Sequence, residues 1–130
     1  MTLADRQAAA SEQGRRFEAA CEVWLLTHGH RIIDRHWVHP ELVIEIDRVT
    51  EHPDHGVVWV ECKGSWESPT GNGLERTDTL KKAIANAAVL RRAPDRRPYW
   101  LICSHLPRIG SRGDIWLATV RDLFDRVHEL

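Results

Sequence analysis

The fold is decided by the stretch Val57-Val58-Trp59-Val60-Glu61-Cys62-Lys63 and by the apolar run that precedes it. β-Branched and aromatic residues of this kind are typical of a strand inside a sheet. Residues 42–49 form a second run that is almost purely apolar, and this run carries Glu45 and Asp47. Residues 51–56 lie between the two runs and contain Pro, Asp and Gly, so they predict a hairpin turn that keeps the two strands adjacent.

On the N-terminal side of these strands, apolar residues recur at helical spacing over residues 8–28. This pattern predicts a helix, and Gly29 is a suitable residue to end it. Residues 31–37 contain two consecutive isoleucines and predict a short strand.

On the C-terminal side, the pattern predicts a loop over residues 64–73, a helix over 74–92, a turn over 94–98 and an apolar strand over 99–103. After a loop over 108–113, we predict an edge strand over 115–118. Thr119 is then expected to cap a last helix that ends at Leu130. That helix is indicated by apolar residues at i, i+3, i+4 and i+7, namely Val120, Leu123, Phe124 and Val127.

The predicted order is α-β-β-β-α-β, followed by a short strand and a terminal helix. A hairpin-linked trio of strands and a helical crossover predict an α/β fold, in which helices flank a mixed central sheet. A length of 130 residues with neither repeats nor a linker indicates one domain over residues 1–130.

The composition narrows the classes of protein. The chain is 42% apolar and 28% charged, which is typical of a folded globular domain rather than a disordered one. No apolar run approaches the ~20 residues that span a bilayer, and residues 1–16 lack the apolar segment of a secretory signal, so we expect a cytoplasmic protein without a membrane partner.

The cysteines are odd in number and widely spaced, so we expect free thiols at Cys21, Cys62 and Cys103. The eight histidines include no convincing helical pair for a structural zinc site.

Three charged residues near the ends of the two central strands are candidates for chemistry. Glu61 and Lys63 are two residues apart and project from the same face of their strand, whereas Cys62 points the opposite way into packing. Asp47 lies near the end of the preceding strand, across the hairpin. The three side chains are therefore expected to meet.

Charged side chains at the ends of apolar strands indicate an ion pair or a metal site, because charged groups are rarely buried unless they are paired or bound to metal. Two carboxylates form a hard oxygen site suited to Mg²⁺ or Mn²⁺, which would polarise a phosphate and lower the pKa of a bound water. Lys63 would position or deprotonate that water, or offset charge in the transition state. The same spacing also fits an exposed strand end, at which Glu61 pairs with Lys63 and Asp47 starts the turn.

At these residues the chain resembles the PD-(D/E)XK nuclease superfamily, the restriction-endonuclease-like proteins. The signature of that superfamily is an acid on one strand and Glu/Asp-x-Lys on the next, which stands here as Ile44-Glu45-Ile46-Asp47 and Val60-Glu61-Cys62-Lys63-Gly64. Many members begin with a helix that carries Gly-x-x-(x)-Glu, which is similar to Gly14-Arg15-Arg16-Phe17-Glu18. The family core has the same α-β-β-β-α-β order, and the resemblance covers roughly residues 14–104. It is greatest to small Mrr-like, NERD-like and junction-resolvase-like domains. A literal Pro-Asp is missing, because Ile46 precedes Asp47.

The resemblance implies roles for individual residues. Asp47 and Glu61 would be metal ligands, with the Cys62 carbonyl as a third, and Lys63 would be the catalytic lysine. Glu18 would be an auxiliary acid that reaches the metal through water, although its position equally fits a surface glutamate. Glu45 would contact the metal ligands without binding the metal itself, or it would form a salt bridge with an arginine.

Candidate nucleic-acid contacts follow the catalytic lysine. Trp66 lies in the loop 64–73, where it would stack on a base or fold back onto the protein. Arg76, Lys81 and Lys82 lie on the next predicted helix, where they would contact phosphate or simply form a solvated helix face.

The function expected from these features is that of a Mg²⁺-dependent endonuclease acting on DNA. A single domain leaves no separate recognition module, so we expect little sequence specificity unless the chain forms a homodimer or joins a larger nuclease complex. One alternative is a catalytically inactive module of the same fold that binds nucleic acid or assembles complexes. Another is an unrelated α/β scaffold with incidental acids.

Overall fold

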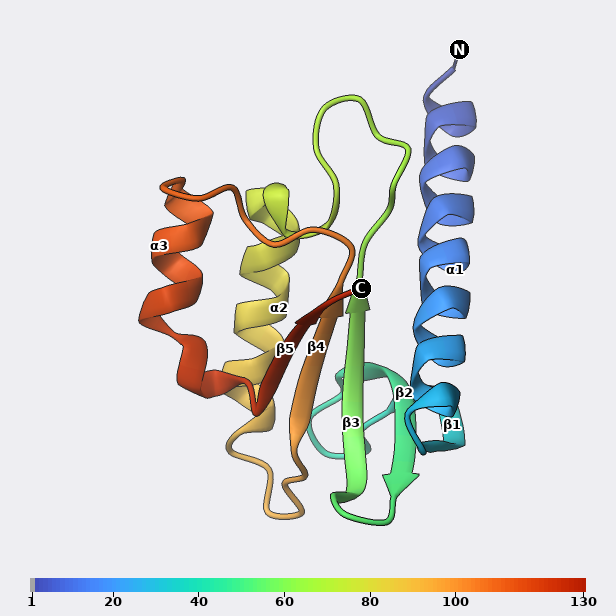
Figure 1. The fold of residues 1–130 in the computed structure, drawn as a ribbon, viewed down its shortest axis with the longest axis vertical. Helices are drawn as coiled ribbons and strands as arrows, with labels where there is room; N and C mark the ends of the chain where they lie inside the picture. The colour runs from blue at the N-terminus through green and yellow to red at the C-terminus, as the bar shows by residue number, and fades with distance from the viewer. Residues whose placement is uncertain (1) are drawn as a thin grey trace.

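One mixed sheet of five strands organises the chain, in the order β1-β2-β3-β4-β5 (Figure 1). The computed structural model describes residues 2–130. The strands are β1 Arg31–Val38, β2 Glu45–His52, β3 Gly56–Lys63, β4 Tyr99–Cys103 and β5 Arg126–Glu129. The pairs β1–β2 and β2–β3 are antiparallel, whereas the pairs β3–β4 and β4–β5 are parallel. The predicted mixed α/β class is therefore confirmed.

Helices cover both faces of this sheet. They are α1 Leu3–Thr27, α2 Thr77–Leu90 and α3 Arg112–Thr119, with short 3₁₀ turns η1 Gly73–Glu75 and η2 Arg121–Leu123. Figure 1 shows α1 on one side of the sheet and α2 and α3 on the other. Of the helices within residues 2–130, none is both long enough and apolar enough to cross a membrane.

The central strand β3 alternates its side chains between two apolar clusters. Val58, Val60 and Cys62 pack against α1, where Phe17 and Cys21 are fully buried. Trp59 lies in the opposite cluster, with residues of α2. Burial of each large apolar side chain contributes roughly 1.5–3 kcal/mol, so the two clusters hold β3 firmly between the helix layers. The prediction that Cys62 points into packing is confirmed, and all three cysteines are buried and free.

β2 begins three residues later than the apolar pattern predicts. Residues 40–42 form a turn, and Val43 has a left-handed φ of 55° with its side chain exposed. The turn closes because His39 accepts the Val43 N–H at its carbonyl, 2.9 Å away. The first residues of the apolar run therefore belong to a tight turn, and the strand begins only after it. Hydropathy alone does not distinguish the two parts of the run.

The C-terminal prediction is wrong in both element types. Residues 115–118 belong to α3 and not to an edge strand, and the chain from Thr119 to Leu130 contains η2 and strand β5 instead of a helix. Ser111 caps α3 by accepting the Asp114 N–H at 3.2 Å. Asp125 then fixes the last reversal of the chain, because it bonds Tyr99 through both its side chain and its backbone. The extra C-terminal elements are thus a helix followed by a strand.

Candidate metal centre

The centre lies where β2 and β3 separate. Their pairing runs from His52↔Gly56 to Arg48↔Val60. Beyond that point, the Asp47 carboxylate accepts the Cys62 N–H through Oδ2 at 2.7 Å. The Asp47 side chain therefore takes over a bond that the strand ladder would otherwise supply, and this fixes the carboxylate between the two strands.

Glu61 is the most deeply buried acid of the centre, with 3% of its surface exposed. Its Oε2 accepts the Tyr99 hydroxyl at 2.8 Å, and its Oε1 lies 3.2 Å from the Lys63 ammonium. Burial and the nearby Glu61 charge raise the pKa of Tyr99, so the phenol keeps its proton and serves as a donor. Asp47 acts on the pKa of both Glu61 and Lys63, so the structure brings the three predicted side chains into one neighbourhood.

The pKa of Glu61 indicates that too little positive charge surrounds the carboxylates of Asp47 and Glu61. Burial, reinforced by repulsion from Asp47, raises the pKa of Glu61 to about 8, although Lys63 and the Tyr99 hydrogen bond act against the rise. One lysine therefore does not compensate two carboxylates, and near neutral pH the protein alone holds a proton on Glu61. A bound cation would supply the missing charge.

Lys63 stays charged in this environment. Burial acts to lower the pKa of its ammonium, but attraction by Glu61 and Asp47 outweighs burial and raises that pKa. A lysine whose pKa is raised suits charge stabilisation better than removal of a proton from water. Of the roles predicted for Lys63, the raised pKa is therefore more compatible with the electrostatic one.

Glu18 approaches the centre from α1, which is the first of the two positions that the sequence left open for it. Its Oε2 lies 3.1 Å from His36 Nε2 and 3.6 Å from Arg48 Nη1. Burial and the neighbouring Asp47 raise its pKa. Arg48 anchors this corner, because its buried guanidinium also bonds Glu22 at 2.8 Å and the Asp47 carbonyl at 2.7 Å.

Sequence reasoning missed His36, Arg48 and Tyr99. His36 lies on β1 with its Nδ1 2.6 Å from Glu45 Oε1, so the partner of Glu45 is a histidine and not an arginine. Glu18, His36 and Asp47 each offer one ligand atom, and these atoms lie within 4.8 Å of one another. Nothing in the sequence indicated His36, because the position of its side chain depends on a positive φ that the hydropathy pattern does not predict. For Tyr99 the sequence predicted a position in a strand but no contact with the acids.

Gly64 begins the loop after Lys63 and lies close to two neighbouring side chains. A Cβ on Gly64 would lie 2.6 Å from Ser104 Oγ and 2.9 Å from the Phe17 ring. Ser104 Oγ in turn accepts the Ser65 N–H at 3.1 Å. The close approach of Gly64 to Ser104 therefore requires a residue without a side chain next to Lys63.

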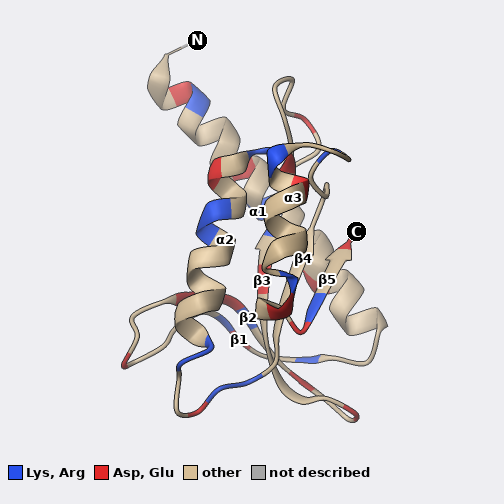
Figure 2. Cartoon of the chain, turned by 90° about the vertical axis from the view of Figure 1, so that its left-hand side faces the viewer, with Lys and Arg blue, Asp and Glu red and all other residues tan. Residues whose placement is uncertain are grey.

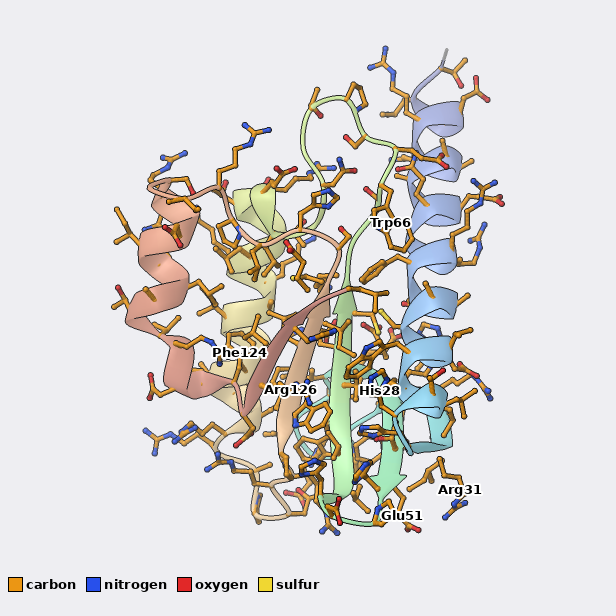
Figure 3. All side chains as sticks on the ribbon, in the orientation of Figure 1. His28, Arg31, Glu51, Trp66, Phe124 and Arg126 are labelled. Carbon is orange, nitrogen blue, oxygen red and sulfur yellow. The ribbon has the colours of Figure 1, made fainter. Side chains whose placement is uncertain are left out.

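Trp66 lies in that loop and shows one of its two predicted behaviours, because it folds back onto the protein. Its ring meets Phe17 of α1 edge-on, with 5.1 Å between centroids, and Figure 3 shows it between the loop and α1. Nevertheless, 49% of its surface stays exposed. Trp66 thus folds back onto the helix while part of its surface stays open to solvent.

The basic candidates lie on and before α2. Arg76, Lys81 and Lys82 are exposed, and Lys81 Nζ lies 5.3 Å from the centre of the Trp116 ring. In the view of Figure 2, basic and acidic segments alternate along the chain and do not gather into one basic face. Their exposure is compatible with contacts to phosphate but does not by itself select that role.

Comparisons of this chain with protein-family models, with curated proteins and with solved structures found no match.

Proposed function

We propose that this protein is a metal-dependent deoxyribonuclease that hydrolyses phosphodiester bonds, with a restriction-endonuclease-like fold over roughly residues 14–104. The observation that carries the proposal is the convergence of Asp47, Glu61 and Lys63 at the split between β2 and β3. Two acids share one lysine there, and burial together with Asp47 raises the pKa of Glu61 to about 8. Such strongly perturbed groups cluster at functional sites.

The donor set fits a hard divalent cation. Asp47 and Glu61 offer carboxylate oxygens, which Mg²⁺ and Mn²⁺ prefer, and the Cys62 carbonyl is a third candidate. Glu18 approaches the same acids from α1. When bound, the ion would polarise the scissile phosphate and lower the pKa of the attacking water.

The residues of the chain supply orientation and charge. The Cys62 N–H fixes the Asp47 carboxylate, and the Tyr99 hydroxyl fixes that of Glu61. The Lys63 ammonium lies beside Glu61, where it would stabilise the negative charge that grows on the phosphate during in-line attack. The centre therefore holds its charged groups before substrate arrives.

DNA is the substrate we favour, and the contacts would come from elements around the centre. Trp66 offers exposed ring surface for stacking on a base. Arg76, Lys81 and Lys82 are exposed and offer positive charge for phosphates. A single domain without a recognition module favours an endonuclease with little sequence specificity of its own, acting alone, as a homodimer or within a larger complex.

The test is a cleavage panel of single-stranded, duplex, flap and four-way DNA with Mg²⁺ or Mn²⁺, each compared with chelator. We expect cleavage by the wild type on at least one substrate and its loss in Lys63→Met. Arg31→Met is the matched control, because Arg31 is an exposed cation at the opposite end of the β1–β2 pair, bonded to Glu51 (Figure 3). Equal behaviour of wild type and Lys63→Met would overturn the proposal. DNA binding without any cleavage would instead support an inactive nucleic-acid-binding module.

A further inference from the structure

His36 occupies an unusual backbone conformation in the edge strand β1. Its φ is 50°, in the left-handed region that residues other than glycine seldom adopt inside a strand. Such a conformation costs on the order of 1–3 kcal/mol and persists where the surroundings impose it, often at functional sites. Arg35 pairs with Arg48 and Trp37 with Ile46, so His36 lies opposite Asp47 across the two strands.

The two nitrogens of the His36 ring have different partners. Nδ1 lies 2.6 Å from Glu45 Oε1, and Nε2 lies 3.1 Å from Glu18 Oε2. Histidines that bind metals usually donate one N–H to a carboxylate, which fixes the tautomer and directs the other nitrogen to the ion. Glu45 can play that part here, and an ion would then take the place of the Nε2 proton that faces Glu18.

The distances suit a common ion. Ligand atoms of Glu18, His36 and Asp47 all lie within 4.8 Å of one another. Protein nitrogens and oxygens bind small divalent ions at about 2.0–2.2 Å, so two ligands of one ion lie roughly 3–4 Å apart. The three residues come from α1, β1 and β2, and half of the His36 side chain is exposed, which leaves room for water or substrate on the open side.

The charges around this set favour a cation. Arg48 is a cation beside this set, but its guanidinium is already bound to Glu22 and to the Asp47 carbonyl. Its contact with Glu18 is longer, at 3.6 Å. The Arg48 guanidinium is therefore shared among Glu18, Glu22 and the Asp47 carbonyl, and it does not serve the two carboxylates of this set alone.

We propose that His36 Nε2, Glu18 and Asp47 together bind one divalent ion, and that the imidazole ligand makes this centre select a transition-metal ion such as Mn²⁺ over Mg²⁺. Imidazole binds first-row transition metals well, whereas Mg²⁺ demands oxygen ligands and retains its waters. This inference rests on the metal centre of the proposed function and refines its choice of cofactor. Glu18 becomes a direct ligand in it, rather than an acid that acts through water.

The test is pulsed electron paramagnetic resonance of Mn²⁺ added to the full chain, without substrate. We expect ¹⁴N modulation from a coordinated imidazole, which changes to the ¹⁵N pattern when only the histidines are ¹⁵N-labelled. The nitrogen signal should vanish in His36→Asn, because asparagine tolerates the left-handed conformation but offers no ring nitrogen. His55→Asn is the control, since His55 lies exposed in the β2–β3 hairpin.

Titration adds a second readout. We expect His36→Asn to weaken Mn²⁺ binding by about 10–100-fold, the range seen even for residues that only support a ligand, and to weaken Mg²⁺ binding less. If His36→Asn does not fold, His36→Gly relieves the strained backbone and serves instead. Bound Mn²⁺ without a histidine nitrogen signal would overturn the inference and leave the nuclease proposal standing. Absence of any Mn²⁺ binding would overturn both, whereas nitrogen ligation without DNA cleavage would refute only the nuclease proposal.

Discussion

Replacement of Glu61 by glutamine is expected to change how the stability of the metal-free protein depends on pH. Glutamine keeps an oxygen that accepts the Tyr99 hydroxyl but removes the carboxylate charge beside Asp47. At pH 5 the wild-type Glu61 is protonated, so both proteins carry a neutral side chain. Their free energies of unfolding should then agree within about 1 kcal/mol.

The two proteins diverge as the pH rises. The pKa of Glu61 is 4.5 in the unfolded chain and about 8 in the folded protein, because burial and Asp47 disfavour the charged form. Between these values the folded state binds more protons than the unfolded state, so wild-type stability falls with increasing pH. The full loss has a ceiling of about 5 kcal/mol, and water entry and relaxation around Lys63 reduce it to a few kcal/mol.

Urea unfolding from pH 5 to pH 9 in the presence of a chelator measures this difference. We expect the wild type to lose stability across the range, Glu61→Gln to lose less, and the variant to be the more stable protein at pH 9. Glu41→Gln removes an exposed acid and should follow the wild-type curve. Parallel curves for wild type and Glu61→Gln would refute the assignment of an uncompensated charge to Glu61.

Two further substitutions test the loop that follows Lys63. Gly64→Ala should lower the free energy of unfolding by about 1–3 kcal/mol, because its Cβ would overlap Ser104 and Phe17. Gly14→Ala, with open space around its Cβ, should instead be neutral or stabilising, and equal urea midpoints for the two variants would contradict this. Trp66→Ala should weaken binding of single-stranded DNA by about 1–3 kcal/mol, as measured by fluorescence anisotropy. Unchanged affinity would mean that Trp66 serves only to pack on Phe17.

The strands that form the sheet centre could be predicted because their local and tertiary preferences agree. β4 has the bounds that its apolar pattern predicts, and β3 begins only one residue earlier. The C-terminal segment could not be predicted in this way. Apolar residues at helical spacing from Val120 to Val127 favoured a helix, but the open edge of β4 needs hydrogen-bond partners, and β5 supplies them. The Ser111 cap was the available signal for α3.

The site was predictable to the extent that it depends on strand alternation. Glu61 and Lys63 share a face by periodicity, and the hairpin brings Asp47 to them. His36 escaped prediction, because its side chain reaches Glu18 and Glu45 from a residue with φ of 50°, and no local pattern announces that conformation. Arg48 reads as an ordinary strand residue, yet it is buried against two glutamates of α1.

Calorimetric titration with Mn²⁺ tests most directly whether Asp47 is the central ligand of a metal centre. We expect saturable binding by the wild type and its loss in Asp47→Asn, which keeps an oxygen to accept the Cys62 N–H but lacks the negative charge. Asp54→Asn, in the exposed β2–β3 hairpin, should bind as the wild type does. An Asp47→Asn protein that binds Mn²⁺ as tightly as the wild type, or a wild type that binds none, would contradict the central claim.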